Sequence, residues 1–555
     1  MKLLQLLRLP PNRYSTARLV RWLWRAWRGN RLQASLNALV GLAGVATSLG
    51  SVWAMQRAID IAAGARAGSL YGAVGVMAAL VACDFALNIA RVWLRNILGV
   101  RAQNRMQRQT LDRLLRAEWQ GKERYHSGDV INRLEQDVQT VVTFLTETLP
   151  GTLSVLAMFA GAFVYLMMMD TMLALVTVAI LPVFVVASKL YVGQMRKLTR
   201  RVRASDSQVQ SILQETVQHR MLIKTLECDD HVVGRLGRSQ AELCANVRRR
   251  TVFSVLSNLV LNAGFALGYL VAFLWSAVRL YRHTITFGTM TAFLQLVYRI
   301  QGPARELTRL APAFVAVLTA AERLMQLEEI PAEEQGEPVV LDPPCGVRLS
   351  GVTYAYADAP GAPVLNSLSF DFRPGTCTAI LGETGAGKTT LIRLVLALLR
   401  PSEGRVEVYG RTGSPVEMSP RLRCNFVYVP QGNTLLSGTI RDNLLLGKAG
   451  ATEREMRDAL TLACADFVYA LPLGLDTPTS EGGGGLSEGQ AQRIAIARAL
   501  LRGRSVMLFD EATSALDPDT ERRLLHNILS SNTRTVLFIT HRPAVVGYCD
   551  SELRL

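Results

Sequence analysis

The sequence predicts a two-part fold, in which a polytopic α-helical membrane domain precedes an α/β domain built around a phosphate-binding loop (P-loop). Two observations predict this division. The chain has 555 residues, 49% of them hydrophobic, with a mean hydropathy of +0.20, and its apolar residues crowd into the first three-fifths. From residue 346 on, short apolar strands alternate with helices around the glycine-rich residues 382–390, as in α/β domains.

Charge and cysteine content favour a membrane protein over a nucleic-acid-binding or disulfide-stabilised one. The formal net charge is +16, but the basic residues flank long hydrophobic segments, so membrane topology explains them better than nucleic acid does. The eight cysteines lie far apart, with no C-x-x-C pair and no histidine cluster nearby. We therefore expect reduced thiols in a protein that is membrane-buried or faces the cytosol.

Residues 1–31 are predicted to form an amphipathic helix at the inner membrane surface. Trp22, Trp24 and Trp27 alternate with arginines, a combination that suits the lipid–water interface. A solvated basic helix is the alternative. The stretch lacks the apolar core and the small-residue cleavage site of a signal peptide, so we expect no cleavable leader.

Six stretches within residues 32–327 are long and apolar enough to cross a bilayer, which takes about 20 residues each. They lie near residues 34–56, 71–94, 148–168, 171–192, 253–278 and 285–308. Two arginine-rich, helix-favouring segments, near 95–146 and 193–252, are the predicted cytoplasmic extensions, whereas the turn around Asp170 has no basic residue. The positive-inside rule therefore places the N-terminus and both extensions in the cytoplasm of an inner (plasma) membrane protein, and six spans return the C-terminal domain to the same side.

An acidic, proline-containing run separates the two domains. It begins at Glu328 and continues through Pro331 and Pro338, and we assign residues 328–345 to a linker. The α/β domain then occupies residues 346–555.

Residues 382–390 have the strand–turn–helix context of a P-loop, between an apolar strand over 378–381 and a helical run over 391–399. Glycines let the backbone wrap closely around phosphate oxygens, and the helix start contributes its positive dipole end. Lys388 can reach the β- and γ-phosphates of a nucleotide, and the Thr389 hydroxyl can bind Mg²⁺. The alternative is a chance glycine-rich turn.

Two further apolar strands end in polar residues suited to phosphoryl transfer. The strand over 505–509 delivers Asp510, which would hold Mg²⁺, and Glu511, which would polarise the water that attacks the γ-phosphate. The strand over 536–540 ends at His541, which can contact the γ-phosphate, and Gln431 is a candidate for the Mg²⁺ and water shell. A helix cap and a structural histidine are the alternatives for the acidic pair and for His541.

A second glycine-rich turn, over residues 481–490, opens a second helix and so predicts a second anion-binding helix start. It contains the segment Leu486-Ser487-Glu488-Gly489-Gln490. One chain has no evident second nucleotide for this turn, which suggests a partner chain.

This ordered set of motifs resembles that of an ATP-binding cassette (ABC) transporter, over nearly the whole chain. The resemblance is to a half-transporter of the type I exporter fold, with a six-span membrane domain fused ahead of an ABC-type P-loop NTPase domain. In family terms residues 382–390 match Walker A, 486–490 the signature, 514–517 the D-loop, and Glu481 the X-loop. Residues 127–129 and 205–227 are similar to the two coupling regions.

The resemblance implies site residues for ATP and Mg²⁺. Gln431 matches the Q-loop, Asp510 and Glu511 match Walker B with its catalytic glutamate, and His541 matches the switch histidine. The implied catalytic residues are Glu511, His541 and Gln431, and the implied Mg²⁺ ligands are Thr389, Gln431 and Asp510. The implied ATP contacts are Tyr356 (stacked on adenine and preferred to Tyr354), Gly382, Glu383, Thr384, Gly385, Ala386, Gly387, Lys388, Thr389, Thr390, Ser487, Gly489 and Gln490.

The resemblance further implies an ATP hydrolase coupled to transport by alternating access. Two cassettes would close head to tail, so the expected partner is a second half-transporter subunit, identical rather than a sister chain. The expected substrate is an amphiphile (a lipid, a peptide or a drug-like molecule), with no nucleic acid. An importer on the exporter fold and an ATP-gated regulator or channel are alternatives; the motifs do not separate the directions, and intact Glu511 disfavours the regulator.

Two features bear on how this chain differs from its family. Position 488 is Glu where the family usually has Gly, which would place a carboxylate near bound ATP and slow the site unless the side chain points away. Ionisable residues in or near the spans are candidates for a polar translocation pathway, because charge in lipid is costly; the alternatives are snorkelling and mutual pairing. These residues are Asp84, Arg91, Glu147, Arg299, Arg305, Glu306 and Arg309.

Overall fold

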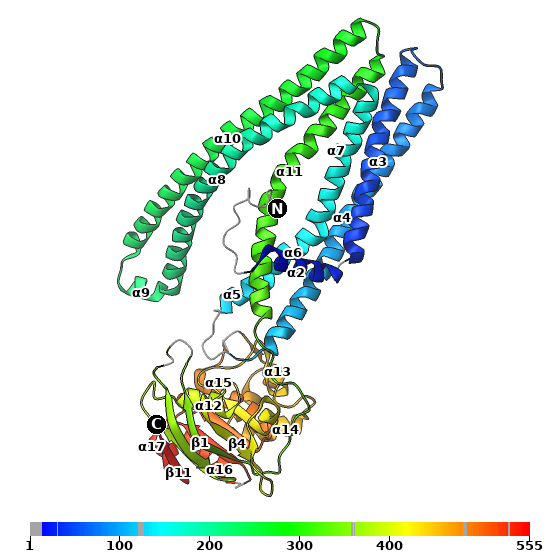
Figure 1. Ribbon diagram of the computed structural model, residues 1–555. Helices are drawn as coiled ribbons and strands as arrows, with labels where there is room; N and C mark the ends of the chain where they lie inside the picture. Colours follow the sequence, from blue (N-terminus) through cyan, green and yellow to red (C-terminus); the bar gives the residue numbers. More distant parts are fainter. Residues whose placement is uncertain are drawn as a thin grey trace. The chain divides into compact units, whose positions relative to one another are not determined.

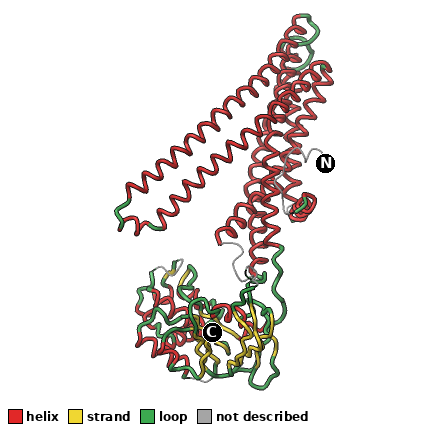
Figure 2. The backbone as a smooth tube through the Cα atoms, turned by 60° about the vertical axis from the view of Figure 1, so that its left-hand side comes forward, coloured by secondary structure: helices red, strands yellow, loops and turns green. Residues whose placement is uncertain are grey.

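The computed structural model describes residues 14–29, 31–119, 127–356, 359, 361–480, 485–530 and 533–555. Their contacts divide the chain into two compact units, one containing Met1–Thr110 and Ile131–Gln326 and the other Leu111–Val130 and Leu327–Leu555. The first unit is built of helices, and the second holds the β-sheets with shorter helices around them (Figures 1 and 2).

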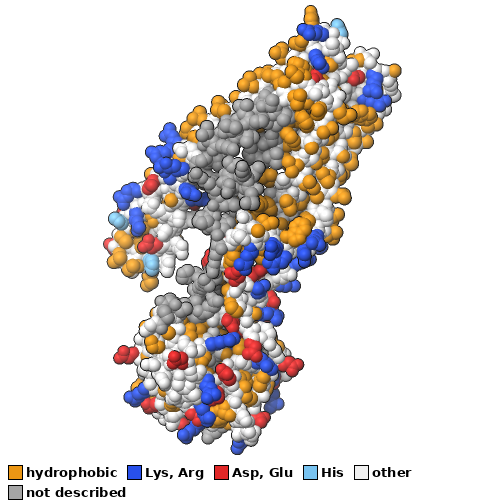
Figure 3. Space-filling view, viewed as in Figure 1, with side chains coloured by type: hydrophobic (Ala, Val, Ile, Leu, Met, Phe, Trp, Pro, Cys, Tyr) orange, Lys and Arg blue, Asp and Glu red, His pale blue; other side chains and the backbone are white. Residues whose placement is uncertain are grey.

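Six long helices dominate the first unit, and the six predicted spans fall on them. The helices are α3 (Arg31–Ala62), α4 (Leu70–Leu115), α7 (Leu149–Met169), α8 (Thr171–Gln218), α10 (Asp229–Tyr281) and α11 (Phe287–Glu328). Within the described residues, four helical stretches are long and apolar enough to cross a membrane: Arg31–Ala62, Leu70–Leu115, Gly128–Met169 and Asp229–Tyr281. Hydrophobic side chains gather on the surface of α3 and α4 (Figure 3), and an exposed stripe on α4 consists of Val81, Phe85, Ile89 and Trp93.

Several of these helices continue well beyond their apolar stretches. α8 has 48 residues and α10 has 53, and the two pack along each other up to the short helix α9 (Arg220–Thr225) that joins them (Figure 1). Asp170 fixes the opposite end of α8, because its Oδ1 accepts a hydrogen bond from the Leu173 amide at 3.1 Å and its Oδ2 lies 2.6 Å from Nη1 of Arg279 on α10. A buried N-cap carboxylate thus ties the start of α8 to α10.

The N-terminal helix α2 (Thr16–Arg28) begins at the N-cap Ser15 and buries one apolar face inside the first unit. Leu19, Trp22 and Leu23 pack in a hydrophobic cluster with residues of α11 and of α6 (Val138–Thr143). The helices α5 (Ser127–Asn132), η1 (Arg133–Asp137) and η2 (Phe144–Thr148) complete the segment that leads into α7. The apolar face of the amphipathic helix α2 therefore packs against the protein. Its location at the membrane surface stays a prediction.

Two main sheets form the centre of the second unit. The antiparallel sheet has the order β2 (Leu365–Phe372), β1 (Gly346–Tyr354), β4 (Glu403–Tyr409) and β5 (Val416–Glu417). The parallel sheet has the order β11 (Ser551–Arg554), β3 (Cys377–Leu381), β10 (Thr535–Ile539), β9 (Val506–Asp510) and β6 (Phe426–Val429). A small antiparallel pair, β7 (Gly438–Thr439) and β8 (Pro478–Thr479), lies apart from both.

The parallel sheet is buried on both faces, which is why its strands read as continuous apolar runs. Along β9, Val506 and Leu508 enter one hydrophobic core, and Met507 and Phe509 enter the other. The α-helices around the sheets are α12 (Lys388–Val395), α13 (Ile440–Leu445), α14 (Glu453–Leu462), α15 (Glu488–Arg502), α16 (Pro518–Leu529) and α17 (Pro543–Val546). The 3₁₀ helices are η3 (Pro420–Asn425), η4 (Asp466–Ala470) and η5 (Gly474–Asp476). Because the strands are parallel, the residues that follow β3, β6, β9 and β10 emerge at one edge of the sheet.

Candidate ATP site and membrane-domain cavity

The P-loop connects β3 to α12 through a backbone that only glycine adopts easily. Gly385 and Gly387 have φ of +94° and +98°. Gly387 caps α12, and a Cβ there would meet Val364 and Leu365 side-chain atoms at 3.0 Å, so a larger residue at this position would crowd its neighbours. Thr389 is exposed in the first turn of α12, and the loop residues Glu383, Thr384 and Gly385 are exposed before the helix begins.

Lys388 makes several polar contacts at the end of this loop, although it is only 8% exposed. Its Nζ donates hydrogen bonds to the carbonyl oxygens of Gly382 at 2.6 Å and Glu383 at 3.2 Å, and it lies 2.9 Å from Nε2 of His541. The structure therefore brings together the P-loop lysine and the histidine that follows β10.

Glu511 and Gln431 join the same cluster from β9 and β6. Gln431 Nε2 donates to Glu511 Oε2 at 2.8 Å, and the other carboxylate oxygen of Glu511 lies 3.6 Å from Nε2 of His541. Glu511 has φ of +48°, a left-handed conformation that costs a non-glycine residue on the order of 1 kcal/mol or more. Its amide is held in place by a 3.0 Å hydrogen bond to the carbonyl of Ile539 on β10. Four of the expected site residues thus meet where the parallel strands end.

Asp510, beside Glu511, is buried and has a partner that the sequence did not suggest. The Tyr428 hydroxyl donates to Asp510 Oδ2 at 3.0 Å across the neighbouring strands β6 and β9. Burial raises the pKa of Asp510, while the hydrogen bond from Tyr428 and the nearby Lys388 charge oppose that shift. The only sequence signal for Tyr428 is a hydroxyl-bearing residue inside an otherwise apolar strand.

Tyr356 lies at the edge of the P-loop helix. Its hydroxyl oxygen is 3.0 Å from Thr390 Oγ1 and accepts a hydrogen bond from Arg393 Nη1 at 3.3 Å. Tyr354 contacts it edge to face, with ring centroids 5.1 Å apart. The hydroxyl of Tyr356 is therefore tied to α12, and its stacking on adenine stays a prediction.

The signature residues occupy the start of α15. The Ser487 hydroxyl accepts from the Gln490 amide at 3.2 Å, the Gln490 side chain accepts from the Ser487 amide at 2.9 Å, and Glu488 is exposed in the first turn. Within the described residues, no hydrogen bond or ion pair joins this turn to the Lys388 cluster. Residues 481–484, which include the X-loop candidate Glu481, lie outside the described residues.

The D-loop residues 514–517 pack between the signature helix and the strand end that carries His541. A Cβ on Gly489 would lie 2.7 Å from the Ala515 carbonyl oxygen, so the two backbones are in direct contact. From the other side Arg542 donates to the carbonyls of Ser514 at 2.6 Å and Leu516 at 3.0 Å. Arg542 Nη1 also lies 3.1 Å from the buried carboxylate of Glu521 on α16. This pair was not predicted from the sequence. The only indication in the sequence was that Arg542 directly follows the site candidate His541.

A cavity of about 1270 Å³ lies among α3, α4, α7, α10 and α11 in the first unit. Asp84, Arg91, Glu147 and Glu306 line it together with apolar side chains such as Leu87. Arg299 lies outside this lining and donates a long hydrogen bond of 3.4 Å to Ser51. The side chains of Arg305 and Arg309 lie outside the described residues. Four of the seven ionisable candidates therefore face one common space.

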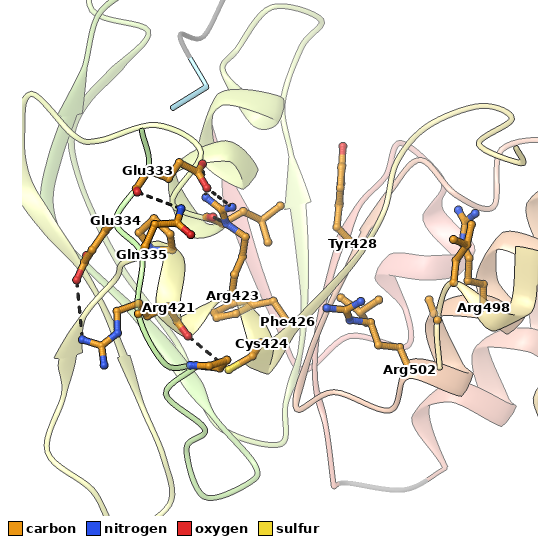
Figure 4. A pocket seen from close by; sticks show the side chains of 18 of the residues that line it. Glu333, Glu334, Gln335, Arg421, Arg423, Cys424, Phe426, Tyr428, Arg498 and Arg502 are labelled. Atoms are coloured by element: carbon orange, nitrogen blue, oxygen red, sulfur yellow. Dashed lines mark hydrogen bonds and ion pairs between the residues drawn. The ribbon is translucent and has the colours of Figure 1, made fainter. Parts of the chain in front are cut away.

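A second pocket, of about 640 Å³, lies in the other unit between residues 333–338, η3, β6 and α15 (Figure 4). A bidentate ion pair in its lining joins Arg423 to both carboxylate oxygens of Glu333, at 2.9 and 2.8 Å. None of the residues expected to contact ATP lines this pocket, although Tyr428, the hydrogen-bond partner of Asp510, does.

Comparison with known proteins gives two family matches in the expected order. Residues 36–303 match the ABC transporter transmembrane region, and residues 365–514 match the ABC transporter domain. An ATP-dependent lipid A-core flippase of Bordetella avium is 27% identical, over 86% of this chain and 80% of its own length. A putative multidrug export ATP-binding/permease protein of Bacillus subtilis is 28% identical, over 76% of this chain and 72% of its own.

Two further proteins are similar to this chain over most of its length. An uncharacterized ABC transporter ATP-binding protein of Sinorhizobium fredii is 29% identical, over 86% of this chain and 82% of its own length. The solved structure of a bacterial Atm1-family ABC exporter with ATP bound has a TM-score of 0.77 and 23% identity, and the match covers 95% of this chain and 93% of that one. The expected fold, a helical transmembrane domain joined to an ABC nucleotide-binding domain, is confirmed. The chain belongs to the ABC transporter family, as a membrane-bound half-transporter that binds nucleotide, couples ATP hydrolysis to transport and acts as a dimer.

Proposed function

We propose that the protein is an exporter or flippase of an amphiphilic substrate, and that a dimer of identical chains drives it by alternating access. The observation that carries this proposal is the convergence of Lys388, Gln431, Glu511 and His541 at one sheet edge, in a chain whose helical unit encloses a large cavity. Relatives named as a flippase and as a multidrug export protein support the outward direction.

The geometry supports a role for each residue of the cluster in ATP hydrolysis. Glu511 is the general base for the attacking water, because it directly follows a buried strand and the Gln431 amide orients its carboxylate. The γ-phosphate would replace the carbonyl and imidazole partners of Lys388, which places the lysine charge on the transferring group. His541 would then contact the same phosphate and report its departure.

The donor set also fits Mg²⁺. Thr389, Gln431 and Asp510 offer a hydroxyl, an amide and a carboxylate oxygen, the hard ligands that this ion prefers. When bound, Mg²⁺ neutralises charge that develops on the phosphates. Tyr428 contributes by holding one oxygen of Asp510 in a fixed direction.

The exposed signature turn supports the dimer. Ser487, Gly489 and Gln490 present a capped helix start that has no contact with the Lys388 cluster of its own chain within the described part. The start of a helix can bind an anion, and this one lies apart from the P-loop of its own chain. It is therefore suited to contact the phosphates of ATP bound by a partner chain. We place both cassettes and the N-terminus in the cytoplasm, and the spans in the inner (plasma) membrane.

The cavity in the helical unit is suited to an amphiphile. It has apolar walls together with Asp84, Arg91, Glu147 and Glu306, so one side of a ligand can lie against hydrocarbon and another against charge. Because its volume exceeds the upper end of ordinary ligand pockets, roughly 1,000 Å³, it accommodates a bulky molecule.

The test is transport by the purified chain in proteoliposomes, with ATP added outside and a fluorescent amphiphile as probe. We expect ATP-dependent movement of a labelled lipid or a drug-like dye toward the leaflet or lumen opposite the cassettes. Glu511→Gln should abolish hydrolysis and transport while ATP still binds, and Glu417→Gln, an exposed carboxylate on β5, should leave both unchanged. Movement toward the cassettes would favour the importer, and ATP turnover by the Glu511 variant at the wild-type rate would overturn the catalytic assignment.

A further inference from the structure

Two cysteines of the second unit have their sulfur atoms in contact. Cys377 is the first residue of β3 and Cys549 precedes β11, and their Sγ atoms are 2.8 Å apart. All eight cysteines of the chain lie in the described residues, and no other pair has its sulfur atoms within hydrogen-bond distance. The two residues are 172 positions apart in sequence, so the fold, not local sequence, creates this pair.

The backbone on both sides holds the pair in place. The Cys377 amide donates to Asp550 Oδ2 at 2.8 Å, and the Asp550 amide donates to the Cys377 carbonyl at 2.9 Å. From there β11 runs parallel to β3, with Ser551 opposite Thr378. The hydrogen bonds that begin the β3–β11 ladder therefore keep the two sulfur atoms facing each other.

We propose that Cys377 and Cys549 form a dithiol site that a peroxide or a low-molecular-weight disulfide oxidises to a reversible disulfide. Cys549 is the partly exposed residue of the pair and reacts first, whereas Cys377 is 4% exposed. With hydrogen peroxide, the Cys549 sulfur attacks one oxygen, the O–O bond breaks, and a sulfenic acid and one water result. The Cys377 sulfur then attacks the Cys549 sulfur, the S–O bond breaks and a second water leaves. Two thiols thus lose two electrons and two protons, and the peroxide becomes two waters.

The low reactivity of Cys377 supports this order of events. The hydrogen bond with Cys549 and burial both raise the pKa of the Cys377 thiol. Cys377 therefore stays protonated at neutral pH and is a poor first nucleophile, but it lies in place to resolve an oxidised neighbour.

The disulfide would act on the strand that leads into the P-loop. β11 is an edge strand of four residues, and the amide of Leu555, the residue that follows it, donates to the Leu381 carbonyl at 2.9 Å. A Cβ on Gly382 would lie 3.1 Å from the Leu555 carbonyl oxygen, so this strand supports the first P-loop glycine. A covalent bond at the start of β11 would prevent fraying of that support. Because it closes a very long loop of the unfolded chain, we expect the Tm of the oxidised protein to rise by about 5 °C or more.

The experiment treats the full chain in lipid nanodiscs with hydrogen peroxide or with oxidised glutathione, followed by peptide mass mapping. In the wild type we expect a peptide linked through Cys377 and Cys549, an intact mass lower by two hydrogens, and a higher Tm, all reversed by dithiothreitol. Cys377→Ser and Cys549→Ser should lose the link and the Tm shift, while Cys244→Ser, which removes an exposed cysteine of α10, should keep both. Because the mapping is done on the wild type, it decides the matter even where a serine variant folds poorly. Both thiols remaining free, or linking to other cysteines instead, would overturn the proposal.

Discussion

Nζ of Lys388 lies 2.9 Å from Nε2 of His541, which links the P-loop directly to the end of β10. The same imidazole lies 3.6 Å from Glu511, so one histidine contacts both the lysine that would bind the γ-phosphate and the base that would activate water. It is thus placed to connect phosphate binding to water activation.

We predict that His541→Ala lowers kcat for ATP hydrolysis by at least about 100-fold, because a positioned group at the reacting phosphate is lost. ATP affinity should change only a few-fold, since Lys388 and the glycine backbone of the loop are unaffected. Steady-state hydrolysis and fluorescent-nucleotide binding in nanodiscs measure the two effects. His526→Ala, which removes an exposed histidine of α16, is the matched control, and equal losses in the two variants would contradict the role of His541.

The sequence was sufficient to predict the parts of this site that are contiguous or that follow buried strands. A P-loop binds phosphate through the backbone of one contiguous segment, so the pattern of residues 382–390 is local and can be recognised in the sequence. Glu511 and His541 each follow an apolar strand, and the parallel sheet then brings them together.

The contacts that sequence reasoning missed join residues that are far apart in the chain. Tyr428 and Asp510 are separated by 82 positions, and Asp170 and Arg279 by 109, so neither pair leaves a periodic signal. Hydropathy identified the apolar spans, and the composition of residues 193–252 predicted the helical extensions that form the outer parts of α8 and α10. The packing of these two helices on each other left no signal in the sequence.

We predict that Tyr428→Phe raises the Mg²⁺ concentration needed for ATP hydrolysis, and that this effect is larger than its effect on the stability of the fold. Removing the hydroxyl leaves buried Asp510 without its 3.0 Å donor, a loss of about 1–3 kcal/mol in such settings. The Mg²⁺ concentration for half-maximal hydrolysis should rise several-fold, because the carboxylate is no longer oriented. Titration of Mg²⁺ at saturating ATP measures this shift. Tyr469→Phe, on η4, is the control, and an unchanged Mg²⁺ dependence in the Tyr428 variant would remove it from the site.

We predict that Glu488→Gly accelerates ATP hydrolysis. Glu488 is exposed in the first turn of α15, where a carboxylate favours the helix but repels the phosphates of a nucleotide bound against that turn. We expect kcat/KM for ATP to rise by about 3- to 10-fold, in line with the removal of one nearby like charge. Glu488→Gln should show a similar gain without added backbone freedom. If neither variant is faster, the carboxylate points away from the nucleotide.

Arg542 and Glu521 connect the D-loop to α16, because Arg542 contacts both the D-loop carbonyls and the Glu521 carboxylate. The Glu521 side chain is 3% exposed and its Oε2 lies 3.1 Å from Nη1 of Arg542, whose own side chain is 35% exposed. Arg542→Ala should therefore cost about 2–3 kcal/mol, less than the 3–5 kcal/mol typical of a fully buried pair, because water reaches one partner.

Thermal unfolding of the full chain measures this loss, which should lower Tm by roughly 5 °C or more. The double variant Arg542→Ala/Glu521→Gln should recover part of the loss, because it no longer buries an unpaired charge. Arg522→Ala, which breaks an exposed pair with Asp519 and a 3.4 Å hydrogen bond to the Pro518 carbonyl on the same helix, should leave Tm within about 1 °C. Additive losses in the double variant would show that Arg542 acts through its D-loop carbonyl hydrogen bonds and not through Glu521.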